Sequence, residues 1–122
     1  MSMTTSTRQV GDVTIVDVSG RIVLGRESSP VRDLIHDLLN NKHKRILLNL
    51  GDVDYIDTIG LGSLVGAFTT VRQQGGELKL LNLAKKVADV MQFTKLYTVF
   101  DIVTDEAAGV ESFSQATVTA KV

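Results

Sequence analysis

The sequence predicts an α/β protein with a mixed, mostly parallel sheet of about five strands, an N-terminal hairpin and about four helices. Two observations support this fold class. Two β-rich segments, 7–10 and 13–18, flank Gly11-Asp12, a two-residue link typical of tight antiparallel hairpins. From residue 30 onward, short aliphatic segments alternate with amphipathic helical patterns, which is the order expected of parallel strands joined by right-handed crossovers.

Composition restricts the class of protein. The chain has 122 residues, of which 43% are hydrophobic and 22% charged, enough for a folded core. It has no apolar run near the roughly 18 residues of a membrane helix, and no signal-peptide layout. A net charge of −1 gives no basic surface for nucleic acid. We expect one cytoplasmic domain over residues 1–122, with a core at 7–113, a loose tail at 114–122, and neither a membrane nor a nucleic acid as a direct partner.

The first third of the chain is expected to hold the hairpin and one helix. Residues 1–6 are small and polar, and the first of them are expected to fray. The first strand is expected to begin at Thr7 and the second to end at Gly20. Ser29 before Pro30 matches a helix N-cap followed by proline at the first helical position. The apolar residues that follow have helical spacing: Val31, Leu34, Ile35, Leu38 and Leu39.

The most informative stretch lies between a predicted strand and a predicted helix. Residues 45–50 are an aliphatic run typical of a strand buried on both faces. Apolar residues then recur at helical spacing from Leu61 to Val71, and Gly75-Gly76 is expected to end that helix. Thr58 lies at the junction, so we expect its hydroxyl at a helix N-terminus on the carboxyl edge of the sheet. Open α/β folds place functional groups at this edge, which makes Thr58 the candidate functional residue.

The last third predicts two more strands and two more helices. A strand is expected at 77–81, and a helix at 84–94 is expected to bury Val87, Val90, Met91 and either Phe93 or Leu96. A strand at 97–103 and a short helix at 105–113 complete the pattern.

Residues 57–62, with the sequence Asp-Thr-Ile-Gly-Leu-Gly, resemble the Asp-Ser/Thr-x-Gly-Leu-Gly motif of STAS domains, the bacterial anti-sigma-factor antagonists. Further segments have the order and spacing of that family, so that the similarity extends over about 13–103. They are Gly20-Arg21-Ile22, the strand at 48–50, Gln74-Gly75-Gly76-Glu77-Leu78, and the helix containing Val87, Val90 and Thr94. One departure is Lys95, where the family usually has a glycine with a left-handed backbone.

The resemblance implies a partner switch controlled by phosphorylation. In the family the hydroxyl residue after the aspartate accepts the phosphate, and here it is Thr58. The unphosphorylated form binds an anti-sigma factor that is also a serine/threonine kinase with the histidine-kinase-like ATPase fold, which releases the sigma factor. A metal-dependent serine/threonine phosphatase reverses the modification. The residues expected at the partner surface are Leu24, Arg26, Asp54, Asp57, Thr58, Ile59, Gly60, Gly62 and Ser63.

Simpler interpretations stay open for these residues. Thr58 alone matches a helix N-cap, and Asp57 matches a first-turn acid that complements the helix dipole. Gly60, Gly62 and Gly66 match close packing of a helix on a sheet. His36 and His43 lack carboxylate or cysteine neighbours in the sequence, so we expect no metal, and we expect no cofactor.

Two functional alternatives also stay open. One is an aspartate-phosphorylated receiver-like domain, but the residues after the second strand, 20–23, lack the acidic pair that such domains use for Mg²⁺. The other is a scaffold that self-assembles without phosphorylation, and a homodimer fits either this scaffold or the antagonist. We expect no enzymatic activity of the chain itself, because the sequence offers no nucleophile–base pair or metal cluster.

Overall fold

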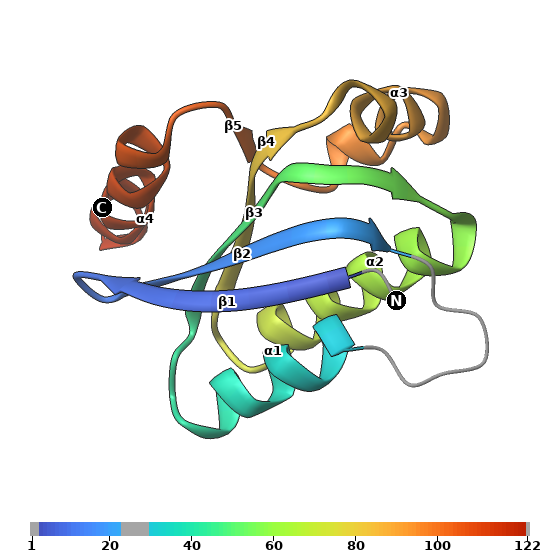
Figure 1. The fold of residues 1–122 in the computed structure, drawn as a ribbon. Coiled ribbons are helices and arrows are strands. Elements are labelled where there is room, and N and C mark those ends of the chain that lie inside the picture. Colours follow the sequence, from blue (N-terminus) through green and yellow to red (C-terminus); the bar gives the residue numbers. More distant parts are fainter. Residues whose placement is uncertain (1–2, 23–29, 122) are drawn as a thin grey trace.

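The predicted α/β fold class is confirmed by the computed structural model, which describes residues 3–22 and 30–121 (Figure 1). In chain order the elements are β1 (Met3–Val10), β2 (Val13–Ile22), α1 (Pro30–Asn40), β3 (Arg45–Ile56), α2 (Thr58–Gln73), β4 (Glu77–Leu83), α3 (Lys85–Thr94), the 3₁₀ turn η1 (Leu96–Thr98), β5 (Ile102–Val103) and α4 (Glu106–Lys121). Ser29, the expected cap of α1, lies outside the described residues.

The five strands lie in the sheet in chain order, β1-β2-β3-β4-β5. β1 and β2 form the expected antiparallel hairpin, in which Val10 faces Val13 across the two-residue turn. Gly11 has a φ of +62°, a value that glycine adopts without strain. The pairs β2–β3, β3–β4 and β4–β5 are parallel, so the carboxyl ends of these strands meet at one edge of the sheet.

Two predictions about the hairpin are wrong. β1 begins at Met3 and not at Thr7, so residues 3–6 also pair with β2. β2 continues past Gly20 to Ile22, and its register with β3 shifts between Gly20 and Arg21. The φ of Gly20 is +99°, so this glycine accommodates an irregularity inside the strand and does not end it.

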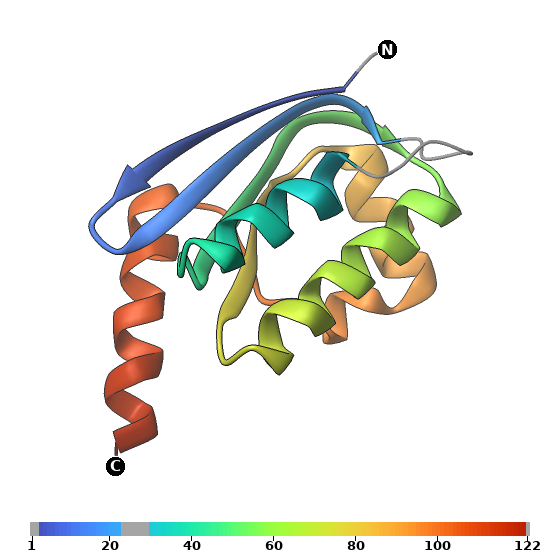
Figure 2. The same ribbon diagram turned by 90° about the horizontal axis from the view of Figure 1, so that it is seen from below.

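The larger core lies between one face of the sheet and helices α1, α2 and α3. α1 and α2 lie side by side on this face (Figures 1 and 2). Most side chains that pack here are aliphatic, and several of β3 and α2 have no measurable exposure, among them Leu48, Leu50, Leu64 and Val71. α2 ends at Gln73 with Gln74 as its C-cap. Gly75 follows with a φ of +81°, and the Gly76 amide donates to the carbonyl of Val71 at 2.9 Å, as in a Schellman motif.

A second core lies on the opposite face, beneath α4 (Figure 1). Phe113 is fully buried there against Ile15, Leu47 and Leu81. A Cβ on Gly109 would lie 2.8 Å from the side chain of Val103, so the helix approaches the sheet closely at this glycine. The prediction that the last helix ends at residue 113 is wrong, since α4 extends to Lys121 and no glycine or proline interrupts it after Gly109.

The segment after α3 also differs from its prediction. The strand expected at 97–103 is reduced to η1 and a two-residue β5. Lys95 has the left-handed backbone usual for a glycine at this place, with φ +63° and ψ +19°, and it ends α3. Phe93, one of two residues expected in the core, is 90% exposed, while Leu96 packs against the larger core. The reason is helical geometry: Phe93 lies two residues after the buried Met91, on the other side of α3.

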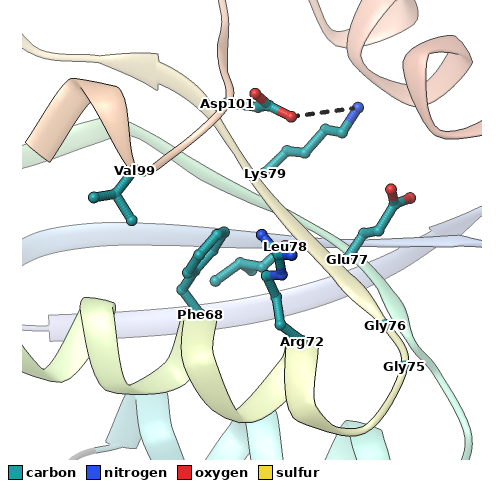
Figure 3. Close-up of a pocket in the computed structure, with 9 residues that line it drawn as sticks. All are labelled: Phe68, Arg72, Gly75, Gly76, Glu77, Leu78, Lys79, Val99 and Asp101. Atoms are coloured by element: carbon teal, nitrogen blue, oxygen red, sulfur yellow. Dashed lines mark ion pairs between the residues drawn. The ribbon is translucent and has the colours of Figure 1, made fainter. Parts of the chain in front are cut away.

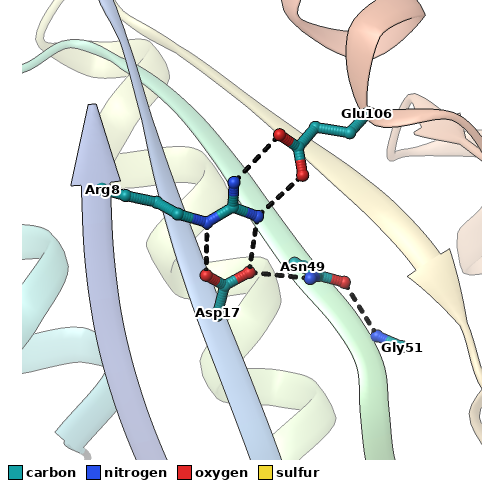
Figure 4. A network of polar contacts seen from close by, with 5 residues as sticks. All are labelled: Arg8, Asp17, Asn49, Gly51 and Glu106. Atoms are coloured by element: carbon teal, nitrogen blue, oxygen red, sulfur yellow. Dashed lines mark hydrogen bonds and ion pairs between the residues drawn. The ribbon is translucent and has the colours of Figure 1, made fainter. Parts of the chain in front are cut away.

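A polar network joins β1, β2, β3 and α4 (Figure 4). The guanidinium of Arg8 donates to both oxygens of Asp17, at 2.6 and 3.1 Å, and to both oxygens of Glu106, at 2.9 and 2.7 Å. Asn49 Nδ2 donates to Asp17 Oδ1 at 2.7 Å, and the Gly51 amide donates to Asn49 Oδ1. Hydrogen bonds from Arg8 lower the pKa of Asp17 and of Glu106 below their ordinary values.

Phe113→Ala is expected to lower the free energy of unfolding by about 3–5 kcal/mol, because it empties the second core. Phe93→Ala is the matched control, with the same change at a 90% exposed position, and is expected to cost less than about 0.5 kcal/mol. Urea denaturation followed by circular dichroism measures both. An equal decrease in the free energy of unfolding in the two variants would contradict the packing of α4 on the sheet through Phe113.

The polar network is expected to make stability depend on pH in the acid range. The pKa values of Asp17 and Glu106 are lower in the folded chain than their ordinary values of 3.8 and 4.5. The network therefore contributes fully to the free energy of unfolding at a pH above the ordinary values. This contribution is lost as the pH falls through the lower pKa values of the folded chain. Asp17→Asn is expected to reduce the difference between unfolding free energies measured at acid and neutral pH. Asp37→Asn, on the exposed side of α1, is the control and should leave that difference unchanged.

Candidate functional site

The candidate site is built at the junction of β3 and α2, on the carboxyl edge of the sheet. Asp57 has an extended backbone, and its Oδ1 accepts the Gly60 amide at 2.6 Å, while its carbonyl accepts the Leu61 amide at 2.8 Å. Asp57 is therefore the N-cap of α2. The interpretations of Thr58 as the cap and of Asp57 as a first-turn acid are both wrong, since Thr58 is the first helical residue.

Side chains around the junction divide sharply between core and solvent. Val53 and Ile56, near the end of β3, are buried, and Leu61 begins the buried face of α2. Between them Asp54 is exposed, and Tyr55 and Ile59 are 40% and 57% exposed. A large aliphatic side chain with more than half of its surface in water, next to exposed carboxylates, is typical of a surface that a partner covers.

Gly62 and Gly66 do not serve close packing. A Cβ built on either glycine has no other atom of the structure within 4 Å outside its own helical backbone. Together with Ile59 they follow helical spacing along the exposed side of α2, so this side of the helix carries no side chain at Gly62 and Gly66. Gly60 is buried and Ser63 is half-buried beside them.

A basic group of side chains lies at the same edge, and none of them is among the residues expected at the partner surface. Arg21 at the end of β2 pairs in register with Tyr55, and its guanidinium lies 4.6 Å from the centre of that ring. Lys85 and Lys86 begin α3, whose N-cap Ala84 provides no side-chain hydrogen bond. These residues and Asp54 line a shallow cavity of about 330 Å³. The pairing of residues 21 and 55 depends on the irregular register of β2, which sequence periodicity does not reveal.

The predicted partner residues are only partly brought together. Asp54, Asp57, Ile59, Gly60, Gly62 and Ser63 belong to one continuous segment that crosses the junction, and Thr58 lies within it. Leu24 and Arg26, the other two expected contacts, lie outside the described residues.

Another cavity lies away from the junction, at the opposite end of the sheet (Figure 3). It measures about 430 Å³ and is lined by the C-terminal end of α2, the start of β4 and the segment before β5, including Phe68, Arg72, Lys79 and Asp101. Lys79 is largely buried, donates to Ser112 Oγ at 2.9 Å and lies 3.9 Å from Asp101. Its amine is therefore engaged between the sheet and α4, away from the junction.

The described residues contain no cluster of three or more metal-ligating side chains. Within the same part of the chain, no helix has the length and hydropathy needed to cross a membrane.

Comparison with known proteins identifies the family. The sequence model of the STAS domain matches residues 4–109, so the chain belongs to the STAS domain family and the resemblance inferred from 57–62 is confirmed.

The individual relatives are regulators of sigma factors by name. The chain is 36% identical over 96 residues to the anti-sigma-B factor antagonist of Bacillus subtilis, covering 79% of this chain and 81% of that protein. It is 30% identical to the putative anti-sigma factor antagonist BtrV of Bordetella bronchiseptica, covering 60% of this chain and 63% of that protein.

Solved structures agree on the fold. A putative anti-sigma factor antagonist from Thermotoga maritima aligns with a TM-score of 0.75 and 25% identity, over 88% of this chain and 92% of that one. The phosphorylated form of the Bacillus protein SpoIIAA aligns with a TM-score of 0.67 and 16% identity, over 90% of this chain and 99% of that one, which shows a shared fold.

Asp57→Ala is expected to lower the free energy of unfolding by about 1 kcal/mol, because the Gly60 amide loses its acceptor. Asp57→Asn keeps an acceptor oxygen and is expected to stay within a few tenths of a kcal/mol of the wild type. Asp54→Ala, at an exposed position three residues earlier, controls for loss of charge. Denaturant titration of the three variants decides whether Asp57 acts as a cap.

Proposed function

We propose that this chain is an anti-sigma-factor antagonist whose binding to an anti-sigma factor is switched off by phosphorylation of Thr58. The unphosphorylated protein presents the junction of β3 and α2 to the anti-sigma factor and thereby releases the sigma factor. The anti-sigma factor is itself the kinase, with a histidine-kinase-like ATPase fold, and a metal-dependent phosphatase restores the binding form. The chain acts by binding and performs no catalysis of its own.

The observation that supports the choice of Thr58 most strongly is the cap made by Asp57. Since the carboxylate of Asp57 already satisfies the Gly60 amide, a hydroxyl is not needed at residue 58 to begin the helix. The family motif nevertheless has a hydroxyl residue at this place. A chemical role, as phosphate acceptor, accounts for it better than helix capping does.

The surroundings of the junction suit a protein partner. The exposed side of α2 offers Ile59 as an apolar contact and two glycines that let a partner backbone approach closely. Exposed apolar and small residues at the centre of a surface with charged residues at its rim are the usual arrangement of a protein interface.

The switch depends on the negative charge that a phosphate adds at the junction. The segment around the junction already carries three carboxylates, on Asp52, Asp54 and Asp57. A phosphate on Thr58 adds about −1.5 to −2 charges to this segment. Removing an uncompensated charge from water in an interface costs several kcal/mol, and each 1.4 kcal/mol weakens binding tenfold. Two or three tenfold decreases in affinity are enough to dissociate a nanomolar complex without any change of fold.

Incubation with ATP and the cognate anti-sigma kinase, followed by mass spectrometry, is expected to find phosphate on Thr58. Thr58→Ala is expected to bind the anti-sigma factor constitutively, and Thr58→Glu at least 100-fold more weakly, as measured by calorimetric titration.

Thr69 provides the matched control for charge on the same helix. It is exposed on α2, eleven residues or about 16 Å further along, so Thr69→Glu makes the same chemical change away from the junction. Equal binding of Thr58→Glu and Thr58→Ala, or equal loss in Thr69→Glu, would contradict the proposed switch. Phosphate found only on Ser28 or Ser63 would contradict the assignment of the acceptor.

A further inference from the structure

The strand β1 forms a free edge of the sheet that nothing in the described part of the chain covers. It pairs along all eight of its residues with β2, and the other side of the strand has no neighbour in the sheet. Its side chains from Thr4 to Val10 are all exposed. Figure 2 shows the strand along the outer margin of the molecule, away from α2 and α3.

Alternate residues of β1 direct their backbone groups outward. Val10 and Val13 flank the two-residue turn, and in such a hairpin this pair exchanges both backbone hydrogen bonds. The pattern then alternates along the strand. The outward-directed N–H and C=O groups are those of Met3, Thr5, Thr7 and Gln9, at a spacing that matches another antiparallel strand.

β1 lacks the features that usually protect an edge strand from pairing. Such edges carry proline, lysine, inward charges or bulges, or they are very short. Residues 3–10 contain no proline or lysine, and their register with β2 is continuous. The one charged side chain, Arg8, is bound to Asp17 and Glu106 (Figure 4), so its charge is compensated. The other residues are mostly threonine and serine, which pair well across strands.

We propose that β1 is a homodimer interface, at which the β1 strands of two copies pair antiparallel and join the two sheets into one of ten strands. A second copy suits this edge because a strand that is nearly free of net charge and rich in threonine is complementary to itself. This proposal is independent of the proposed function, because it involves the edge of the sheet remote from α2.

The charge of Arg8 distinguishes between the possible registers of the two β1 strands. In two symmetric registers, seven residues of each strand are paired and the outward-directed N–H and C=O groups face each other. The two-fold axis lies at Ser6 in one register and at Thr7 in the other. An axis at Ser6 places Arg8 opposite Thr4, with the two arginines about 13 Å apart along the strands. An axis at Thr7 brings the arginines to about 7 Å, and an axis at Arg8 sets like charges directly opposite. The structure therefore favours the axis at Ser6.

This dimer leaves both candidate functional sites accessible. The paired strands run in opposite directions, so the carboxyl edges of the two sheets, each with its β3–α2 junction, lie at opposite ends of the joined sheet. One dimer can thus hold two anti-sigma partners at once.

Sedimentation equilibrium over a range of protein concentration tests the proposal. The wild type is expected to approach twice the monomer mass, with a dissociation constant on the order of 10–100 μM for so small an interface. Thr5→Pro removes an outward N–H and leaves the pairing with β2 intact, so it is expected to abolish the dimer. Thr5→Val keeps the N–H and the branched side chain and should dimerise like the wild type. Phe93→Ala, which removes the most exposed large apolar side chain, should do so as well.

A cysteine cross-link tests the register, because the chain has no cysteine of its own. Ser6→Cys at the axis is expected to oxidise to a covalent dimer, since facing residues at a non-hydrogen-bonded pair lie within disulfide distance. Thr4→Cys, on the same face, should not, because its counterpart lies about 13 Å away.

Mixing two variants with opposite charges at residue 6 tests the interface directly, because misfolded variants would not regain association when mixed. Ser6→Lys and Ser6→Asp are each expected to weaken self-association about threefold, and an equimolar mixture of the two is expected to regain at least the wild-type affinity. A wild type that stays monomeric to about 1 mM would overturn the proposal. So would a dimer that persists in Thr5→Pro or that is lost in Phe93→Ala. Folding of each variant is checked by circular dichroism.

Discussion

Burial of β3 on both faces is the constraint on which the rest of the structure depends. Ile46 and Leu48 pack toward the helices α1–α3, while Leu47 packs toward α4, and none of the three has measurable exposure. A strand buried in this way must have neighbours on both sides, because its backbone groups cannot reach water. The parallel pairs β2–β3 and β3–β4 and the crossover helices that connect them follow from this requirement.

The functional edge arises where this burial ends. In the second half of β3 only Val53 and Ile56 stay buried, and Asp54 and Tyr55 between them face solvent. The chain then enters α2 through the Asp57 cap. A rigid strand and a capped helix thus present a short exposed segment, and such a segment can change partners through its charge while the core on either side of it stays packed.

Hydrophobic periodicity predicted much of this arrangement, because burial in the helices and strands repeats over several turns. The hairpin, the crossover order and the place of Thr58 at the start of α2 all depend on such patterns. Hydrophobic periodicity did not predict the burial or the role of single residues. Phe93 and Phe113 are the same residue type in two helices, but the phase of the helix exposes the first and buries the second. Residue type alone also allowed a cap at Thr58, whereas the side chain one residue earlier reaches the free amide.

Long-range polar contacts were beyond sequence reasoning for a different reason. Arg8 and Glu106 are separated by 98 residues and meet only because β1 and the start of α4 lie on the same part of the sheet. No local pattern indicates such a pair. The basic group at the carboxyl edge has the same origin, since Arg21 reaches Tyr55 through the shifted register of β2.

In the proposed switch, the separation of the buried core from Thr58 accounts for how a phosphate would act without unfolding the protein. The residues of α2 that hold the helix on the sheet are Leu61, Leu64, Ala67 and Val71, all buried and all after the first three helical positions. A negative group at the first position lies at the positive end of the helix dipole, where it stabilises the helix by a few tenths to about 1 kcal/mol. The same charge costs several kcal/mol when a partner must remove water from it. We therefore expect a phosphate on Thr58 to be tolerated by the free protein and opposed by the proposed complex, and this difference is what a reversible switch requires.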